Sequence, residues 1–334
     1  MKKSLIYLFS LLCMLTLATS CSDDEKGGTD DAWKEISKDY TSDKLSIGTV
    51  STSGTISVNA ASADKATIIL NNVVAGESSV SVDATLTKTD AGYAFEGEST
   101  ATTCNVKVSG TIENGKLTAA ISRTLTSALA GTLNLNYVPY MNDMQIAQAH
   151  ARFNTGDAQM DAMLNGMAAP VVGQLIAKEV ESVTVNLGEE GTFSFSFKKV
   201  GASEETVMPP AKLQEMIKSY LTWYEKENVL YLAVHKDALT ILSGLNILPE
   251  NIDLETILGL LTVEGDYYTL PLQVKEEDGL TTIYLNKDIL VKAWEVAKPL
   301  VGNIQDETIQ SILAMVDQVM AKAKEIEFGL VFKK

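Results

Sequence analysis

Short runs of alternating apolar and polar residues dominate the chain from about residue 40 to 140. Side chains two positions apart share one face of a strand, so this alternation is typical of strands with one buried face. In the clearest hairpin, Val106 and Val108 share a face, the chain turns at Asn114-Gly115, and the pattern resumes with Leu117. Asn-Gly favours a type I′ turn because both residues there take a positive φ. The pattern predicts an all-β domain over 40–140, folded as a barrel or a sandwich.

The spacing changes after the segment 141–156, which we interpret as a linker because its residues are mostly polar or small. From about residue 157, apolar residues recur three and four positions apart, which predicts a helix with one buried face. Pro170 is expected to kink or split this helix, and its methionines are expected to fill gaps in the core. The helical pattern is formed by Met160, Met163, Leu164, Met167, Val171, Leu175 and Ile176.

Hairpin patterns alternate with helical patterns through the rest of the chain. The stretches 226–239 and 277–290 each contain a turn, a strand, Lys-Asp and the start of an apolar helix, which suggests an internal hairpin-helix duplication. Asp237 and Asp288 are placed to cap those two helices. The predicted fold class is therefore α+β: an N-terminal all-β barrel or sandwich, followed over 157–334 by an α+β domain with antiparallel strands and amphipathic helices.

The first twenty residues have the composition of a targeting signal. Lys2 and Lys3 precede the apolar run 5–18, which gives way to small polar residues. As a helix this run would span about 21 Å, which is short of the ~30 Å hydrocarbon core of a membrane. We therefore predict that residues 1–20 are a secretory signal peptide rather than a transmembrane helix.

The end of this signal resembles a bacterial lipobox. Leu17-Ala18-Thr19-Ser20-Cys21 places small residues before a cysteine, although the leucine lies four residues before the cysteine rather than the usual three. The resemblance implies that Cys21 is lipidated and that residues 21–39 form a flexible tether, so that acyl chains hold the protein on a membrane. The alternative is cleavage near Ser20 without lipidation, which would give a soluble periplasmic protein.

An acidic run follows this cysteine directly. Ser22, Asp23, Asp24 and Glu25 resemble the surface-export signal of Bacteroidetes lipoproteins. The resemblance implies an outer-membrane lipoprotein that is exposed on the cell surface. An acidic spacer that only avoids retention in the inner membrane would instead leave the protein on the periplasmic face.

Composition restricts the class of partner. The 334 residues carry 27 basic and 43 acidic side chains, a formal charge of −16, and the only arginines are Arg123 and Arg152. Nucleic-acid binding requires a concentrated basic face, so nucleic acid is not expected as a partner. Of the three cysteines, Cys13 is expected to leave with the signal peptide and Cys21 is expected to be lipidated. Cys104 then has no disulfide partner, and its strand pattern predicts that it is buried.

Motifs for catalysis and metal binding are missing from the sequence. It contains no CxxC, HExxH, GxSxG or GxGxxG pattern, and its two histidines, His150 and His235, lie 85 positions apart. A zinc site would then need carboxylates for its remaining ligands, which is unusual. We therefore expect no enzyme activity, no cofactor and no metal.

Aromatic side chains are the remaining candidates for ligand binding. Tyr220, Trp223 and Tyr224 lie close together along the chain. Exposed aromatic rings can stack on sugars or cover apolar ligands. The alternative is that these rings belong to the core.

Several of these features occur together in one protein family. The Cys21 tether, the hairpin 108–117 and the β-rich stretch that ends at 131–139 resemble Bacteroidetes outer-membrane lipoproteins with a calycin-like β-rich N-terminal domain. The resemblance covers residues 1 to about 140 and implies a calycin-like β-barrel. It supplies no catalytic residues for this chain.

Three functions remain open. The first is a surface-anchored, non-enzymatic binding or accessory protein for a glycan or an apolar small ligand. The second is a lipid carrier, in which the helices and curved sheet of the second domain enclose an apolar groove lined by residues such as Met160, Met167 and Leu175. The third is a hydrolase with an unrecognised acidic site, which requires a deep cleft with two convergent acids of raised pKa.

Overall fold

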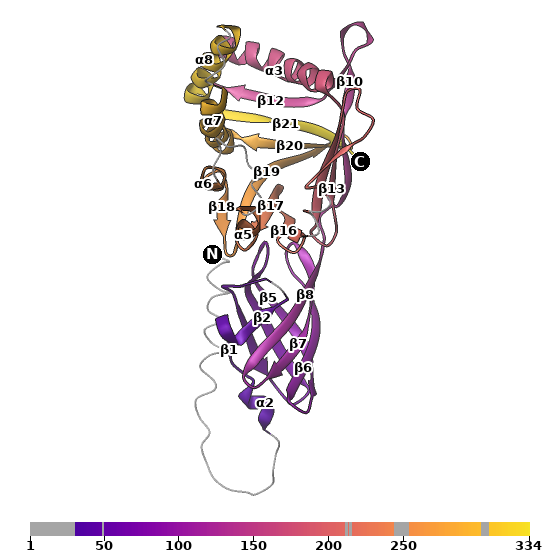
Figure 1. Ribbon diagram of the computed structural model, residues 1–334, viewed down its shortest axis with the longest axis vertical. Helices are drawn as coiled ribbons and strands as arrows, with labels where there is room; N and C mark the ends of the chain where they lie inside the picture. Colours follow the sequence, from indigo (N-terminus) through magenta and orange to yellow (C-terminus); the bar gives the residue numbers. More distant parts are fainter. Residues whose placement is uncertain (1–30, 49, 211–212, 214–215, 244–253, 302–306) are drawn as a thin grey trace, which may run out of the picture. The chain divides into compact units, whose positions relative to one another are not determined.

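The computed structural model describes residues 31–48, 50–210, 213, 216–243, 254–301 and 307–334. The signal peptide 1–20, the lipidation residue Cys21 and the export residues Ser22, Asp23, Asp24 and Glu25 lie outside the described residues. Contacts divide the chain into the units Met1–Ala32 and Trp33–Lys334, and the two large β-sheets both lie in the second unit (Figure 1).

The first sheet has eight strands and forms a nearly closed barrel, which confirms the predicted N-terminal β fold (Figure 1). Its order is β1-β3-β4-β5-β6-β7-β8-β2, with antiparallel neighbours except for the parallel pair β2 and β8. The edge strands β1 and β2 follow one another along the chain, through the 3-10 turn Ser42–Lys44, so both edges of the sheet lie close in sequence. The strands are β1 (Asp39–Tyr40), β2 (Leu45–Ile47), β3 (Thr55–Ala60), β4 (Lys65–Val74), β5 (Glu77–Lys88), β6 (Gly92–Thr100), β7 (Cys104–Glu113) and β8 (Lys116–Leu125).

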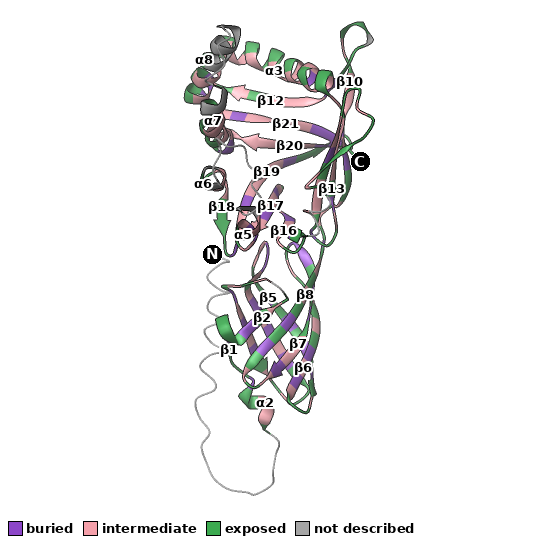
Figure 2. Cartoon of the chain, viewed as in Figure 1, coloured by how far each residue is buried: buried purple, intermediate pink, exposed green. Residues whose placement is uncertain are grey.

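Alternate residues along the barrel strands are buried (Figure 2). Along β5, Val80, Val82, Ala84 and Leu86 are buried, whereas the residues between them are exposed. Cys104 is also buried, as the alternation predicts. The barrel interior is filled by large side chains that include Tyr40, Ile56, Ile68, Leu70, Ile112 and Leu117.

The β7–β8 hairpin has the predicted turn. Asn114 and Gly115 take φ values of 51° and 74°, which a type I′ turn requires at both central positions. The turn places Ile112 opposite Leu117, and both side chains are buried in the barrel.

The second sheet is antiparallel and has eleven strands, which confirms the predicted α+β class. Its order is β15-β14-β13-β9-β21-β20-β19-β17-β16, while β12 pairs with β21 and β18 pairs with β19. The strands are β9 (Gly131–Leu135), β12 (Ala149–Asn154), β13 (Val180–Leu187), β14 (Phe193–Lys199), β15 (Thr206–Met208), β16 (Leu221–Lys226), β17 (Val229–His235), β18 (Thr262–Glu264), β19 (Tyr267–Glu277), β20 (Leu280–Asn286) and β21 (Glu325–Lys333). A separate two-stranded sheet is formed by β10 (Tyr137–Pro139) and β11 (Gln145–Ala147).

The described helices are mostly in the second half of the chain. They are α2 (Ala32–Glu35), α3 (Ala158–Glu179), α5 (Ala238–Ser243), α6 (Leu254–Leu258), α7 (Lys287–Val301) and α8 (Glu307–Lys322). The helix α3 continues through Pro170, so the expected split does not occur. The side chain of Asp157 accepts hydrogen bonds from the backbone N–H groups of Gln159 and Met160, which caps the start of α3.

Both stretches of the repeated pattern form a hairpin followed by a helix, β16–β17–α5 and β19–β20–α7. Asp237 lies directly before α5, and its carboxylate accepts hydrogen bonds from Ser51. The cap expected from Asp288 is wrong. At α7, Asn286 rather than Asp288 accepts the hydrogen bond from the backbone N–H of Ile289.

Three predicted boundaries need correction. β9 was expected in the first domain, yet it pairs with β13 and β21 of the second sheet. The expected linker 141–156 contains β11 and β12, and β12 pairs along its whole length with β21. The expected tether 21–39 includes α2 and the first residue of β1. The partners of β12 lie 171 to 181 positions further along the chain, from Asn154↔Glu325 to Ala149↔Leu330. The local sequence of β12 therefore carries no sign of this pairing.

Candidate functional site

The register of the second sheet places apolar side chains on one face. Phe328 of β21 lies opposite Leu285 of β20 and Ala151 of β12. We call this side the apolar face. Its members include Ala149, Ala151 and Phe153 of β12, Ile326, Phe328 and Leu330 of β21, Ile283 and Leu285 of β20, Leu270 and Leu272 of β19, Leu230 and Leu232 of β17, Trp223 of β16, Val183 and Val185 of β13, and Phe193, Phe195 and Phe197 of β14.

The opposite face of the same strands is polar. His150 and Arg152 of β12 lie on it, and both contact Glu327 of β21, at 2.7 Å from the histidine Nε2 and 3.0 Å from the arginine Nη1. Thr282 and Tyr284 of β20 lie on this face as well. The second sheet is therefore amphipathic.

The sheet curls around its apolar face. Along the strand order, β13 and β16 are separated by β9, β21, β20, β19 and β17. Even so, the hairpin between β13 and β14 binds β16: the Trp223 backbone N–H donates to the Gly191 carbonyl and its indole Nε1–H donates to the Gly188 carbonyl, both at 2.9 Å. The apolar face is thus the inner, concave face.

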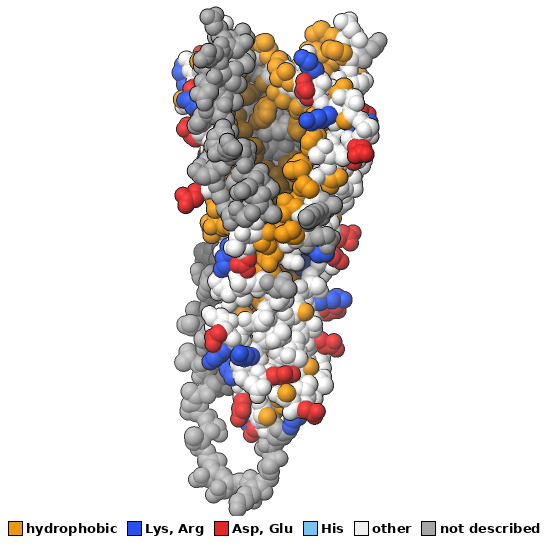
Figure 3. All heavy atoms as spheres, in the orientation of Figure 1, with side chains coloured by type: hydrophobic (Ala, Val, Ile, Leu, Met, Phe, Trp, Pro, Cys, Tyr) orange, Lys and Arg blue, Asp and Glu red, His pale blue; other side chains and the backbone are white. Residues whose placement is uncertain are grey.

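Much of this concave face is open to solvent. Figure 3 shows a hollow lined by hydrophobic side chains, which we call the groove. Leu270, Ile283, Phe328 and Leu330 are only half-buried, and Phe195 is 42% exposed. The same strands are mostly intermediate in burial in Figure 2, unlike the alternating buried positions of the barrel. A contiguous apolar surface that is exposed to solvent often marks a site that binds a ligand or a partner.

The helix α3 lines one end of the groove. Leu164 of α3 and Phe153 of the apolar face both pack against a buried cluster of Val319, Ala323 and Ile326. Residues three or four positions further along lie on the same stripe of the helix. The stripe continues with Met167 (59% exposed), Val171 (46%) and Leu175 (61%), and Met163 beside it is 48% exposed. Met163 and Met167, which were expected in the core, are therefore exposed beside the groove, whereas Met160 is half-buried.

Polar contacts fix α3 along β12. The side-chain amide of Asn165 accepts a hydrogen bond from the Phe153 N–H at 2.7 Å and donates to the Phe153 carbonyl at 3.0 Å. Gly173 packs directly on β11, because a Cβ there would lie 2.2 Å from the Ala147 carbonyl oxygen. The helix thus covers the edge of the sheet and stabilises it against pairing with another chain.

The three aromatic residues proposed from sequence do not form an exposed platform. Trp223 and Tyr224 are buried, and Tyr220 is half-buried with its ring centroid 6.3 Å from that of His235. The Tyr224 hydroxyl donates to Glu264 at 2.5 Å. Burial is the larger cause of the raised pKa of Tyr224, and this hydrogen bond raises it further. Neither buried ring has a face on which a sugar could stack.

These aromatic residues belong instead to a joint between the barrel and the second sheet. A Cβ at Gly76 of the barrel would lie 2.7 Å from the Tyr224 ring. The Arg123 guanidinium donates to the carbonyls of Ala75 and Trp223 and to the Thr222 hydroxyl. The sequence carried no signal for this joint, because its partners lie about 100 positions apart.

Two serines of the barrel complete the joint. Ser51 donates from its N–H and its hydroxyl to the carboxylate of Asp237, and Ser53 does the same with Asp266. Burial acts to raise the pKa of Asp266, but hydrogen bonds from Lys236 and Ser53 outweigh it and hold that pKa at about 2. A cavity of about 710 Å³ lies beside the joint, and Arg123 and Asp266 in its lining are already bonded within the joint.

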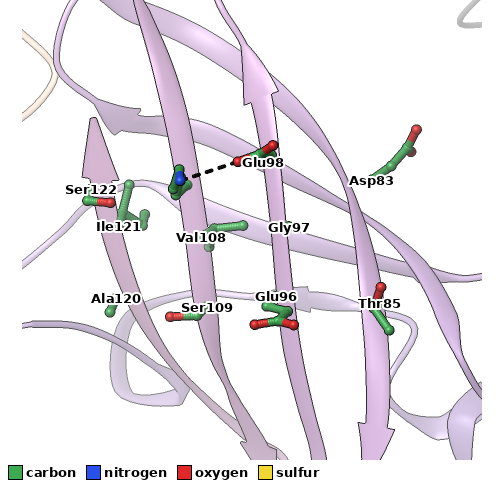
Figure 4. A pocket seen from close by; sticks show the side chains of 11 residues that line it. Asp83, Thr85, Glu96, Gly97, Glu98, Val108, Ser109, Ala120, Ile121 and Ser122 are labelled. Carbon is green, nitrogen blue, oxygen red and sulfur yellow. Dashed lines mark ion pairs between the residues drawn. The ribbon is translucent and has the colours of Figure 1, made fainter. Parts of the chain in front are cut away.

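The outside of the barrel offers a second, shallow hollow of about 680 Å³ (Figure 4). Polar side chains of β5 and β6, including Asp83, Thr85 and Glu96, line it, and Glu98 pairs with Lys107 at 3.5 Å. The pKa of every described carboxyl group with a resolved shift is lowered. A general acid uses a raised pKa, and none of these groups has one.

Within the described part of the chain, no cluster of three or more His, Cys, Asp or Glu side chains could hold a metal ion. None of the described helices has the length and apolar character needed to cross a membrane. Comparison with known protein families, curated proteins and solved structures finds no match for this chain.

Proposed function

We propose that the protein is a surface-exposed lipoprotein of the outer membrane that binds an apolar small ligand in the groove and catalyses no reaction. The observation that carries this proposal is the exposure of the apolar face together with the stripe of α3. Removing apolar surface from water contributes ~25 cal/mol per Å². A ligand that covers the groove is therefore stabilised there without a single polar contact.

The chemistry of the groove supports an apolar ligand over a glycan. Sugar hydroxyls need hydrogen-bond partners when they leave water. The described floor of the groove presents hydrocarbon side chains such as Leu270, Ile283 and Leu330. Trp223 and Tyr224, which could have stacked on a sugar, are buried.

The anchoring part of the proposal rests on the N-terminal sequence. Acylation of Cys21 would hold the protein on the membrane, and Ser22, Asp23, Asp24 and Glu25 would direct it to the cell surface. Each acyl chain contributes about 0.8 kcal/mol per buried CH₂, so two or three chains anchor a protein without a spanning helix. With a charge of −16, the chain is repelled from anionic lipid, which keeps its folded part clear of the bilayer.

Ligand binding is tested with Nile red, a neutral dye that fluoresces when it leaves water. Because Trp33–Lys334 form one compact unit, the chain from Ser22 can be studied in solution. We expect the dye to bind the wild type and to bind Phe195→Glu at least ~10-fold more weakly, since an unpaired carboxylate is costly to desolvate.

Val207→Glu is the matched control. Val207 is 43% exposed, against 42% for Phe195, and it lies on the neighbouring strand with its side chain on the opposite face. Both residues are already exposed, so neither substitution should change stability much. Equal dye binding by the two variants, or no binding by the wild type, would refute the proposed function.

A further inference from the structure

We propose that the groove binds a membrane phospholipid by its acyl chain and leaves the headgroup in water, so that it selects ligands by chain length and not by headgroup. This inference rests on the proposed function and adds the class of ligand, its orientation and the basis of selection. Three features of the groove carry it: its lining, its length and the difference between its two ends.

Among the described residues, the middle of the groove floor presents no polar side chain to a headgroup or a peptide. Leu270, Ile283, Leu285, Phe328 and Leu330 form the middle of the floor. The backbone groups of these strands are used in the ladders that join β17, β19, β20 and β21. Protein interfaces typically carry about one hydrogen bond per 100–200 Å², whereas a hydrocarbon chain needs none. An acyl chain therefore matches the floor better than a polypeptide does.

The length of the groove suits a membrane lipid. The open part of the groove crosses the strands β12, β21, β20, β19 and β17, which are successive neighbours in the sheet, and it ends at β16 (Figures 1 and 3). Four steps of about 4.8 Å between neighbouring strands give roughly 19 Å. One leaflet of a bilayer has a hydrocarbon thickness of about 15 Å. An extended acyl chain of a membrane lipid can thus lie in the groove over its whole length.

The two ends of the groove differ. At the β16 end, Trp223, Leu230 and Leu187 are at most 1% exposed, so that end is closed by packed side chains. At the α3 end, Met167 and Leu175 are 59% and 61% exposed. The chain end of the lipid must therefore point toward β16, and the headgroup lies beyond α3. Methionine side chains are flexible, which suits them to cover chains of different shape.

Selection is tested by displacing Nile red with lysophospholipids below their micelle concentration. In one series the headgroup is phosphocholine and the chain lengthens stepwise. At about 0.8 kcal/mol per buried CH₂, affinity should rise by up to about fourfold per carbon and level off when the chain reaches Trp223. In a second series the chain is constant, and exchange of phosphocholine for phosphoglycerol or phosphoethanolamine should change affinity less than ~2-fold, with no dependence on salt.

Orientation is tested by placing one charge at the open end. Leu175→Lys should create about a fivefold preference for phosphoglycerol over phosphocholine, since a charge pair 4 Å apart in water gains about 1 kcal/mol. Val207→Lys, on the other face of the sheet, should create none. A preference in both variants or in neither would overturn the proposed orientation.

The outcomes separate this inference from the proposed function. If Nile red does not bind, the proposed function itself fails. If Nile red binds but no lysophospholipid displaces it, or if affinity follows the headgroup or the salt concentration, the inference fails and the proposed function stands. If an N-acylated peptide displaces the dye and a lysophospholipid of equal chain length does not, the groove serves acylated proteins and the assignment to membrane phospholipid is wrong.

Discussion

Substitution of Gly173 by alanine tests how closely α3 is seated on the sheet. A Cβ at this position would lie 2.2 Å from the Ala147 carbonyl oxygen and 3.4 Å from its carbonyl carbon. The obstacle is backbone and cannot rotate away. To reach an ordinary contact distance of 3.4 Å, the helix would have to move by about 1.2 Å. The movement would shift the exposed stripe of Met167 and Leu175 relative to the apolar face.

The expected size of the effect follows from two opposing contributions. Alanine is a better helix former than glycine by about 0.5–1 kcal/mol, while overpacking typically costs 1–3 kcal/mol. Gly166 on the same helix provides the control, because a Cβ there meets no atom within 4 Å. Gly166→Ala should therefore stabilise the protein by about 0.5–1 kcal/mol. The helix-propensity gain cancels between the two variants, so Gly173→Ala should be less stable than Gly166→Ala by roughly 1–3 kcal/mol.

Urea denaturation of the two variants and the wild type measures these differences, with Nile red binding as the second readout. Gly173→Ala should shift the unfolding midpoint to lower urea than Gly166→Ala and should also change the affinity for the dye. If Gly173→Ala is as stable as Gly166→Ala, α3 does not pack on β11 as closely as the structure shows. If stability falls but dye binding stays the same, α3 does not line the groove.

Three further predictions concern the joint, the anchor and the buried cysteine. The pKa of Asp266 is about 2 in the folded protein against 3.8 for the free group, so its bonds contribute stability above pH 4 that is lost as the pH falls from about 4 to 2. At about 1.4 kcal/mol per pKa unit, the wild type should lose roughly 2 kcal/mol more stability than Asp266→Asn over that range. Parallel profiles of stability against pH for the two proteins would contradict this account. Cys21→Ala should release the protein from the membrane fraction, whereas Cys104→Ala should leave it there; a membrane-bound Cys21→Ala variant would rule out lipidation as the anchor. Burial raises the pKa of the Cys104 thiol, so a thiol reagent should modify Cys104 only in denaturant, and rapid labelling of the native protein would show that the barrel core is open.

The barrel could be predicted largely from the sequence. Strands such as β5, β7 and β8 alternate between buried and exposed residues along most of their length, and a tight turn joins β7 to β8. In such strands the side-chain pattern and the turn chemistry select the same register. The buried position of Cys104 follows from the same alternation.

The groove could be predicted only in part. The spacing of Met163, Met167, Val171 and Leu175 correctly indicates an apolar stripe on α3, but the expectation that the methionines fill the core is wrong. Similarly, the clustering of Trp223 and Tyr224 indicates a place where aromatic side chains gather, and the structure shows that they are buried at the joint. Periodicity shows which residues share a face, and it carries no information on what covers that face.

The sequence by itself determined the α+β class, the local alternation of the barrel strands and the spacing of apolar residues along α3, because these depend on residues a few positions apart. The tertiary structure decided which strands join the second sheet, that the hairpin at Gly188 and Gly191 meets Trp223, and that the apolar face is therefore concave and open. These features depend on hydrogen bonds and packing between residues far apart in the chain. The same apolar pattern would describe a closed core, and only the curl of the sheet and the position of α3 make it a groove.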